Sequence, residues 1–478
     1  RDLPPRMRSS LRTTARAARL RARRLSTAVT DIATPADVKG GSTEAHQNVL
    51  LTERKLAFKP FTPKNRTVRV EASALFCESN DPLQHGADDV GRYFQFDDST
   101  SVFGDVFYHQ GFLGEHMQRV AAQLKTSAMM VREPALALRD ELLGLQQRGE
   151  LGSSSGIIVN GPAGCGKSAM LNYALACCHQ AGWLVVTVPY AADWTLGLSA
   201  RTAQWPNEAY RVKDTTFLKQ LPPALTGTAA AGGVDELYDA PDASVNFLLG
   251  HALSQTERFR QIAIKDPERA EFYAPHAEDS SKPTLADLLR YVLEDGASSF
   301  EEFPVAVRPL HDFMMELQTA TEVPVLVVVD GWNRFHQMAS ATQWDSKVPL
   351  HSQKLMMPRI LGDLEGYGGA MANGVMLCGV TRSDARPPRV PKRMRKFVPP
   401  PPDFAQPESL PAAVRSALRE VGPFSALETQ RALEFYAYAG HLQNVGLEAQ
   451  LRTGELRRKV QLMTGGVGAD VFKLCEQM

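Results

Sequence analysis

A glycine-rich stretch followed by lysine and serine is the part of the sequence best suited to chemistry. Its spacing is G-x-x-x-x-G-K-S, and its glycines would let successive backbone N–H groups turn toward a polyphosphate, where a β-carbon would clash. Lys167 would then reach the β- and γ-phosphates, and the Ser168 hydroxyl would bind Mg²⁺. The alternative is an ordinary glycine-rich turn before a core helix. The predicted nucleotide-binding loop consists of Gly161, Pro162, Ala163, Gly164, Cys165, Gly166, Lys167 and Ser168.

The residues on either side of this loop indicate how it is positioned. A short β-branched run at 156–160 precedes it, and apolar residues at helical spacing follow it over 169–178, which predicts strand, loop and helix. A second apolar run at 183–189 completes a βαβ unit and therefore predicts a parallel sheet. Upstream, helical spacing at 115–124 and 135–145 predicts two helices, the second with Pro134 in its first turn.

Two further apolar runs predict strands of the same sheet. The run at 323–330 ends in Asp330, which would emerge at the carboxyl edge of the sheet, where ligands bind. Asp330 is therefore the candidate Mg²⁺ partner, direct or through a bound water. The run at 374–380 is followed by Thr381 and Ser383, candidates for holding an attacking water, although a polar strand end in a turn is an equal alternative.

Composition limits the class of protein. With 478 residues, 44% hydrophobic and 22% charged, the chain is expected to be a soluble protein of two or three domains. No apolar run reaches about 18 residues, so no membrane span is expected. Its six cysteines form no C-x-x-C pair, which favours a reducing compartment. We predict a nucleotide-binding core at 101–398, with a helical insertion at about 197–320 whose helices lie at 245–264, at 285–293 behind a Thr284 cap, and at 300–317, interrupted by Pro304 and Pro309.

The two ends of the chain differ from this core. Residues 1–28 contain nine arginines and one acid, whereas the formal charge of the whole chain is zero. This composition fits either a mitochondrial transit peptide or an arm that neutralises RNA phosphates. Residues 29–100 are polar and turn-rich, and we expect an irregular extension there.

A dense basic run precedes the carboxy-terminal part of the chain. It is either a solvated face or a footprint for RNA backbone. A proline stretch at 399–402 follows it, and 399–478 is expected to be a smaller helical domain, with helices at 410–421, 427–441, 456–463 and 471–478. The candidate RNA-binding residues are Arg386, Arg389, Lys392, Arg393, Arg395 and Lys396.

Several blocks, in order and spacing, resemble one known family. They are MMVREPALAL at 129–138, the GPAGCGKS loop, WLVVTVPYAADW at 183–194, ERF at 257–259 and VDGWN at 329–333. The family is the death-associated protein three family, the GTP-binding proteins of the mitochondrial ribosomal small subunit.

This resemblance implies an AAA+-related P-loop NTPase core, an α/β fold whose parallel sheet is flanked by helices, with a small helical lid. It also implies a bound GTP or GDP with Mg²⁺, a base pocket lined by Met130 and Arg132, and a place in the small subunit of the mitochondrial ribosome, in the matrix. The implied partners are small-subunit rRNA and other mitoribosomal proteins, and a contact with the large subunit is left open.

The residue after Asp330 bears on catalysis. Active ATPases of this fold usually place a water-polarising Glu there, whereas this chain has Gly331. No arginine finger is evident either, so we expect at most a slow GTPase whose nucleotide is structural. The alternatives from other classes are an active mitochondrial AAA+-type ATPase or chaperone and a nucleotide-gated apoptotic signalling adaptor.

Overall fold

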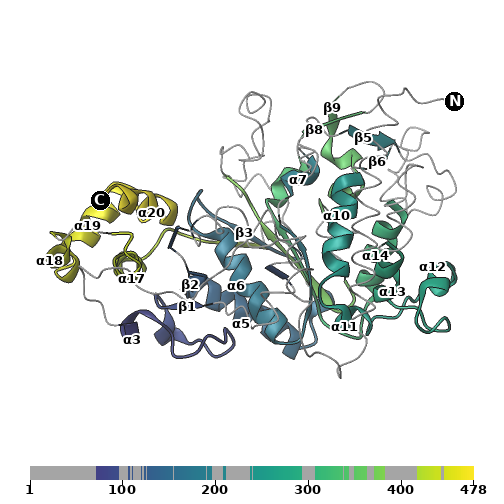
Figure 1. Ribbon diagram of the computed structural model, residues 1–478, viewed down its shortest axis with the longest axis horizontal. Helices are drawn as coiled ribbons and strands as arrows, with labels where there is room; N and C mark the ends of the chain where they lie inside the picture. The colour runs from purple at the N-terminus through teal and green to yellow at the C-terminus, as the bar shows by residue number, and fades with distance from the viewer. Residues whose placement is uncertain are drawn as a thin grey trace, which may run out of the picture.

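A five-stranded parallel β-sheet lies at the centre of the computed structural model (Figure 1). Each pair of neighbouring strands runs in parallel, which confirms the predicted parallel sheet. In spatial order the strands are β11 (Leu418–Glu420), β3 (Ile157–Asn160), β10 (Gly374–Gly379), β7 (Val325–Asp330) and β4 (Leu184–Val188). The structure describes residues 72–95, 106–107, 110, 120, 123–124, 126–153, 156–189, 191–195, 208–211, 237–239, 241–292, 307–336, 338–343, 349–362, 371–382, 417–442 and 446–478.

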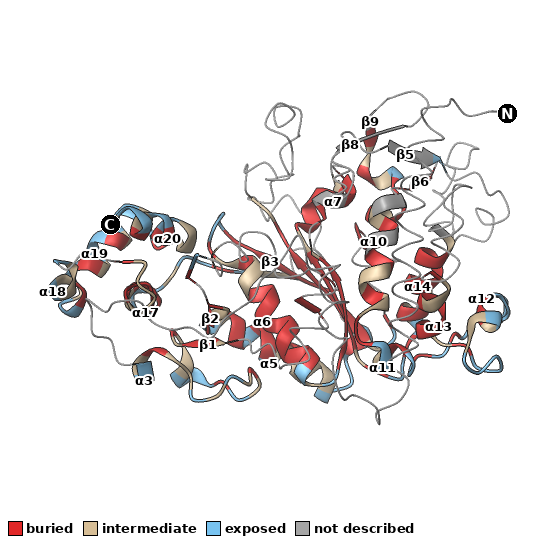
Figure 2. Ribbon diagram, in the orientation of Figure 1, coloured by how far each residue is buried: buried red, intermediate tan, exposed pale blue. Residues whose placement is uncertain are grey.

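Side chains of the sheet alternate between two buried faces. On β7, Leu326 and Val328 join one hydrophobic cluster, whereas Val325, Val327 and Val329 join another. Strands β3, β4, β7 and β10 are accordingly buried along almost their whole length (Figure 2), as expected for a parallel sheet covered on both sides. One face packs against α5 (Glu133–Gln147) and α6 (Lys167–Gln180), and the other against α10 (Pro241–Ala252), α13 (Leu285–Tyr291) and α14 (Val307–Thr319).

Strand β11 corrects one prediction. A helix was expected over 410–421, but residues 418–420 form a strand. Ile158 donates a backbone hydrogen bond to Ala417 (2.8 Å), and Val421 donates one to Asn160 (2.8 Å). These bonds to the edge of β3 outweigh the local helical pattern. The sheet therefore includes a strand from the range that was expected to be a separate helical domain.

In the described part of the chain, side chains instead of another strand cover the outer edge of β4. The Gln255 amide donates to the carbonyl oxygen of Val185 (2.7 Å) and accepts from its N–H (3.0 Å). Gln255 has a left-handed backbone, with φ of 49°, and it divides the single helix expected over 245–264 into α10 and α11 (Thr256–Phe259). That prediction was wrong because satisfying an exposed sheet edge outweighs helix continuity here.

His251 on α10 caps the same edge. Its Nε2 accepts a hydrogen bond from the backbone N–H of Thr187 (3.2 Å), so Nδ1 must donate to the Phe247 carbonyl (2.7 Å). Both bonds require a neutral ring, and burial lowers the pKa of His251 to about 4.

This lowered pKa predicts a loss of stability in mild acid. Between pH 6.5 and 4 the unfolded chain binds a proton at His251 and the folded chain does not, so the free energy of unfolding falls as the pH falls. From pH 7 to pH 5 the loss at this site should be about 2 kcal/mol. Denaturant titrations at both pH values should show a smaller drop for His251→Gln than for the wild type. An equal drop in both would contradict this role.

A second, four-stranded sheet was not anticipated from the sequence. Its strand order is β6-β5-β8-β9, with β5 parallel to β8 and the other pairs antiparallel. The buried indole N–H of Trp332 donates to the Leu361 carbonyl (2.8 Å), which ties the segment after β7 to the helix that follows this sheet. The elements here are β6 (Tyr238–Asp239), β5 (Glu208–Arg211), β8 (Met338–Gln343), β9 (Pro349–His351), α7 (Ala192–Thr195) and α15 (Met356–Gly362).

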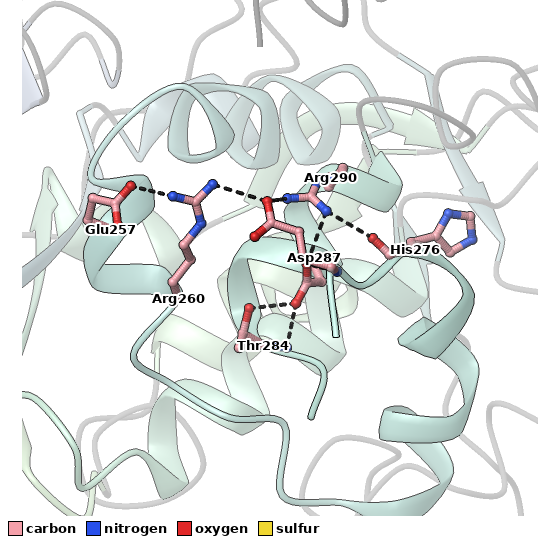
Figure 3. Close-up of polar contacts among 7 residues, drawn as sticks. Glu257, Arg260, His276, Thr284, Asp287 and Arg290 are labelled. Carbon is pink, nitrogen blue, oxygen red and sulfur yellow. Dashed lines mark hydrogen bonds and ion pairs between the residues drawn. The ribbon is translucent and has the colours of Figure 1, made fainter. Parts of the chain in front are cut away.

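The loop before α13 is braced by ion pairs at the surface (Figure 3). Glu278 contacts both Arg260 (3.2 Å) and Arg290 (2.6 Å), and Arg290 also reaches Asp287 (3.4 Å). Asp287 and Thr284 form the capping box of α13, which confirms the predicted cap. Because Glu278 is 61% exposed, its two ion pairs add little to stability. They connect the turn that follows α12 (Pro267–Tyr273) to Arg260 and Arg290.

Prolines act as expected in one helix and differently in another. Pro134 lies in the first turn of α5, as predicted. In contrast, Pro309 does not interrupt a helix: it lies near the start of α14, which the structure describes from Val307, where first-turn N–H groups need no helical partner. Pro304 lies outside the described residues.

The two ends of the described chain pack together beside the sheet. The ring of Tyr93, on β1 (Tyr93–Gln95), stacks on Phe435 of α17, with centroids 3.8 Å apart. Part of the expected irregular extension is therefore ordered against the core, since β1 also pairs with β2 (Ala128–Met130). The helices of this region are α3 (Ala72–Leu75), α17 (Ala426–Tyr438), α18 (Leu447–Arg452), α19 (Glu455–Thr464) and α20 (Gly468–Gln477).

The helices predicted over 427–441, 456–463 and 471–478 are thus present, and Gly465 ends α19 with a φ of 62°. All six cysteines are free. None of the helices within the described residues is long and apolar enough to cross a membrane. Residues 1–28, residues 29–71, most of the helix expected at 115–124 and the basic run at 386–396 lie outside the described residues, so the predictions for them stay predictions.

Candidate nucleotide-binding site

The glycine-rich loop (residues 161–168) connects β3 to α6 at the carboxyl edge of the sheet. Its glycines have backbone angles that other residues rarely adopt: φ is 150° at Gly161, 79° at Gly164 and 96° at Gly166. The helix then begins at Lys167, so its first N–H groups lie next to the loop. This is the strand, loop and helix arrangement that the sequence predicted.

The carboxy-terminal part of the chain packs closely on this loop. A β-carbon at Gly164 would lie 2.7 Å from the Ala469 β-carbon, and one at Gly161 would lie 2.2 Å from the Val421 carbonyl oxygen. The Ala469 N–H also donates to the Gly164 carbonyl (3.0 Å). These two glycines are therefore needed for packing as well as for backbone conformation.

Replacing Gly164 tests this packing. Gly164→Ala should lower the free energy of unfolding by about 1–2 kcal/mol for the left-handed backbone and by about 1–3 kcal/mol more for overpacking against Ala469. Gly465→Ala is the matched control, because Gly465 also has positive φ but a β-carbon added there would meet no atom within 4 Å. Denaturant titration should show the larger loss at Gly164, and equal losses would argue against the contact.

Lys167 is held inside the loop by the loop's own carbonyl groups. Its Nζ donates to the Gly161 oxygen (2.8 Å) and to the Pro162 oxygen (2.7 Å). The side chain is buried, and burial lowers the pKa of Lys167. A charged phosphate oxygen would be a stronger partner for the ammonium than these neutral carbonyls.

Ser168 and Asp330 meet at the head of α6. The Ser168 hydroxyl donates to Oδ2 of Asp330 (2.7 Å). Burial raises the pKa of Asp330, and the bond from Ser168 and the charge of Lys167 oppose that rise. The carboxylate lies at the end of β7, next to Gly379 of β10, where a β-carbon would come 3.0 Å from Oδ1.

These two oxygen-bearing side chains suit Mg²⁺, which takes few protein ligands and completes its octahedron with water and phosphate oxygens. Within the part of the chain that the structure describes, His, Cys, Asp and Glu nowhere gather in groups of three or more that could hold a metal. Ser168 and Asp330 would therefore depend on a phosphate to complete such a site.

Arg132 connects three parts of the site. It donates to the Cys165 carbonyl of the loop (2.7 Å), and its Nε forms a 2.9 Å ion pair with Glu428 at the start of α17. It also donates to the carbonyls of Gly422 (3.1 Å) and Pro423 (3.2 Å). Both members of the pair are buried, so each charge depends on the other. We call this cluster the Arg132–Glu428 tie.

A small pocket opens beside the loop and the tie. Most of its lining is apolar, and Arg132 and Tyr173 also contribute to it. The structure thus brings Met130 and Arg132, which were predicted to line a base pocket, to one hollow next to the loop. Its lining includes Met130, Arg132, Ala135, Met170, Tyr173 and Val421.

Two predicted site residues remain, Thr381 and Ser383, the candidates for holding an attacking water. Thr381 follows β10, and its backbone N–H and C=O are both bound by the Asn333 side chain (2.9 and 2.8 Å). Ser383 lies outside the described residues.

Two contributors to the site were missed in the sequence: Glu428, which pairs with Arg132, and Asn333, which holds the backbone of Thr381. The Ser425-x-x-Glu428 capping box was visible as a helix start. Its pairing with Arg132, 296 residues away, was not.

Comparison with known proteins gives one family. The family model described as mitochondrial ribosomal death-associated protein 3 matches residues 129–212 and 251–474, well over half of the chain. The two matched stretches contain the glycine-rich loop, Asp330 and both members of the Arg132–Glu428 tie. No curated protein matches the chain.

Proposed function

Because the chain belongs to the mitochondrial ribosomal death-associated protein 3 family, and is thus a small-subunit protein of the mitochondrial ribosome in the matrix, we propose that it holds a guanine nucleotide with Mg²⁺ as a structural cofactor. One observation carries the proposal. Lys167 and the Ser168–Asp330 pair converge on a loop whose three glycines have positive φ, at the carboxyl edge of a parallel sheet. Ligands of parallel α/β proteins bind at this edge.

Each residue has a distinct part in the proposed binding. Lys167 exchanges its carbonyl partners for phosphate oxygens, and the N-terminus of α6 faces the same charge. Ser168 and Asp330 hold the Mg²⁺, which neutralises phosphate charge when bound. Met130 and Arg132, which line the small apolar hollow beside the loop, lie nearest the base. Guanine as the base, and the assignment to AAA+-related P-loop NTPases, follow from the resemblance to the family.

Slow turnover follows from the residue after Asp330. Gly331 has no side chain to orient a water, and its φ of 75° is one that glycine adopts readily. Phosphoryl transfer relies on positioning and charge, so losing the water-orienting group slows hydrolysis without weakening binding. A retained nucleotide stabilises the folded chain by mass action, by about 4 kcal/mol at a thousand times Kd. Slow turnover of a nucleotide that stays bound favours the structural role over a motor or a signalling switch.

We also propose contacts with small-subunit rRNA and neighbouring ribosomal proteins. The basic run at 386–396 supplies six cations that suit an RNA backbone. Crosslinking of assembled small subunits should recover rRNA on peptides from this run. Recovery of rRNA only on other segments would assign the run to a solvated face.

Two measurements test the proposed role, the first for residence in the small subunit and the second for nucleotide binding. Sedimentation of mitochondrial lysate should place the chain in the small-subunit fraction, and the isolated chain should bind GTP and GDP but turn over GTP slowly. Turnover of many ATP molecules per second would instead support the motor alternative. Failure to bind any nucleotide would refute the proposed cofactor.

A further inference from the structure

Helix α19 presents two large apolar side chains to solvent. Leu462 is 88% exposed and Met463 is 67% exposed. Among the described residues, the only other exposed large apolar side chains are Phe272 (36%) and Leu427 (48%). The helix lies in the group at the end of the long axis opposite α12 (Figure 1). The adjacent pair on α19 is thus an exception in a chain that otherwise buries its large apolar groups.

The inner face of α19 already anchors the helix. Leu456 and Val460 are fully buried in the cluster that α19 shares with α17 and α20. At 100° per residue, Leu462 lies about 200° around the helix from Val460, on the opposite side. Leu462 therefore contributes little to folding, and a change at this position should leave the stability of the chain unchanged.

Cations share the outer face with Leu462. Arg458 and Lys459 precede it by four and three residues, a spacing that places side chains on one helix face. Lys459 pairs with Glu455 (2.8 Å), whereas neither Arg458 nor Arg457 has a carboxylate partner among the residues that the structure describes. The buried Nε of Arg457 has no hydrogen-bond partner either. Three cations and one acid leave α19 with an unbalanced positive charge.

This mixture of side chains favours a protein partner over RNA. An RNA backbone would attract the cations but would gain nothing from Leu462 and Met463, and Glu455, which is 52% exposed, would repel it. Protein interfaces, in contrast, are enriched in Arg and Met and bury apolar side chains inside a polar rim. Because the face is basic, a complementary partner must supply carboxylates.

We propose that the outer face of α19 binds an acidic segment of a neighbouring ribosomal protein. We call this surface the α19 face, and it consists of Arg458, Lys459, Leu462 and Met463. The partner packs an apolar side chain against Leu462 and places a carboxylate beside Arg458, whose charge has no partner within the described chain. The inference rests on the proposed contacts with neighbouring ribosomal proteins and names the surface and the chemistry of one of them.

A crosslink from the α19 face identifies the partner directly. Leu462 is replaced by the photo-crosslinking residue p-benzoylphenylalanine in chain that is assembled into mitochondrial small subunits. Irradiation should join the chain to one protein, in a segment where acidic residues flank apolar ones. The same replacement at Lys473, which is 66% exposed on α20, is the control and should give at least about tenfold less of this product.

Binding measurements test the same face without a crosslinker. The purified chain is titrated onto small subunits from mitochondria that lack it, and the bound fraction is measured by sedimentation. Leu462→Asp should weaken binding by about tenfold or more, because it loses apolar burial and repels the partner's carboxylates. Arg458→Glu should also weaken it, and Lys473→Gln should stay within about twofold of the wild type. If Leu462→Asp lowers Tm, Arg458→Glu provides the same test.

Each outcome supports the inference or overturns it. A crosslink to an acidic protein segment, together with weaker binding of Leu462→Asp, supports it. Crosslinks to rRNA, to a segment without acidic residues or to no neighbour overturn it, and so does equal binding of Leu462→Asp and the wild type. These results leave the proposed function in place. A wild-type chain that does not bind small subunits at all would instead refute the proposed ribosomal contacts, and this inference with them.

Discussion

Lys167→Met should weaken nucleotide binding severely without lowering the stability of the nucleotide-free protein. Methionine keeps an unbranched side chain of similar length, so packing is retained, and the variant no longer buries an ammonium whose pKa is lowered by that burial. The ammonium is, however, the group that would bind the phosphates. We expect Kd for GTP to rise by about a hundredfold or more.

Thermal unfolding with and without nucleotide separates these two effects. At a GTP concentration of a thousand times the wild-type Kd, the wild type should gain about 4 kcal/mol and Lys167→Met about 1.4 kcal/mol or less. Lys459→Met is the control, since Lys459 is 51% exposed on α19 and pairs with Glu455, and it should keep the wild-type gain. An equal nucleotide-induced gain in Lys167→Met would show that the loop does not hold the phosphates.

Arg132→Met should destabilise the protein strongly, by about 3–5 kcal/mol. The substitution leaves the buried Glu428 carboxylate without its ion-pair partner and removes the donor to the Cys165 carbonyl of the loop. Nucleotide affinity should fall as well, because Arg132 lines the pocket beside the loop. Glu428→Gln should cost less, since a neutral amide does not leave a buried charge unpaired.

A double-mutant cycle isolates the tie. Combined with Glu428→Gln, Arg132→Met should cost clearly less than the sum of the two single changes, with an interaction of about 1–3 kcal/mol. The same cycle at the exposed pair Arg452 and Glu448 serves as the control, where about 0–1 kcal/mol is expected. Additive losses at Arg132 and Glu428 would show that the two charges do not stabilise each other.

The tie gives the carboxy-terminal helices a direct connection to the loop. Glu428 is part of the capping box of α17, and Ala469 at the start of α20 donates to the Gly164 carbonyl. Anything that moves these helices must therefore break contacts made by the loop itself. A nucleotide that orders the loop would stabilise the same contacts, which is the physical basis for a structural cofactor.

Much of the central sheet could be predicted from the sequence because its strands are short, continuous apolar runs. The run that ends at Asp330 is the clearest case, since the residues of β7 before the acid, Val325 to Val329, are all buried. In contrast, β11 could not be predicted: Leu418 and Arg419 are only partly buried, and their strand conformation comes from backbone bonds to β3. Its edge position leaves no apolar pattern to detect.

The candidate site also divides into residues that local sequence predicts and residues that only the fold brings together. The residues of the loop, Ser168 included, are adjacent in sequence, so residue types and spacing predicted them together. Arg132 was predicted only from the resemblance, and its partner Glu428 is brought to it by the fold. Gln255 is the opposite case, where a local helical pattern was overridden by the need to satisfy the edge of β4.

The most direct test of the cofactor is the nucleotide content of the chain in its ribosome. The protein should be released from purified mitochondrial small subunits under native conditions and weighed by mass spectrometry. We predict a mass increase equal to one guanine nucleotide with Mg²⁺ in the wild type, and none in subunits that contain Lys167→Met. Wild-type chain that leaves intact small subunits without a guanine nucleotide would contradict the proposed function.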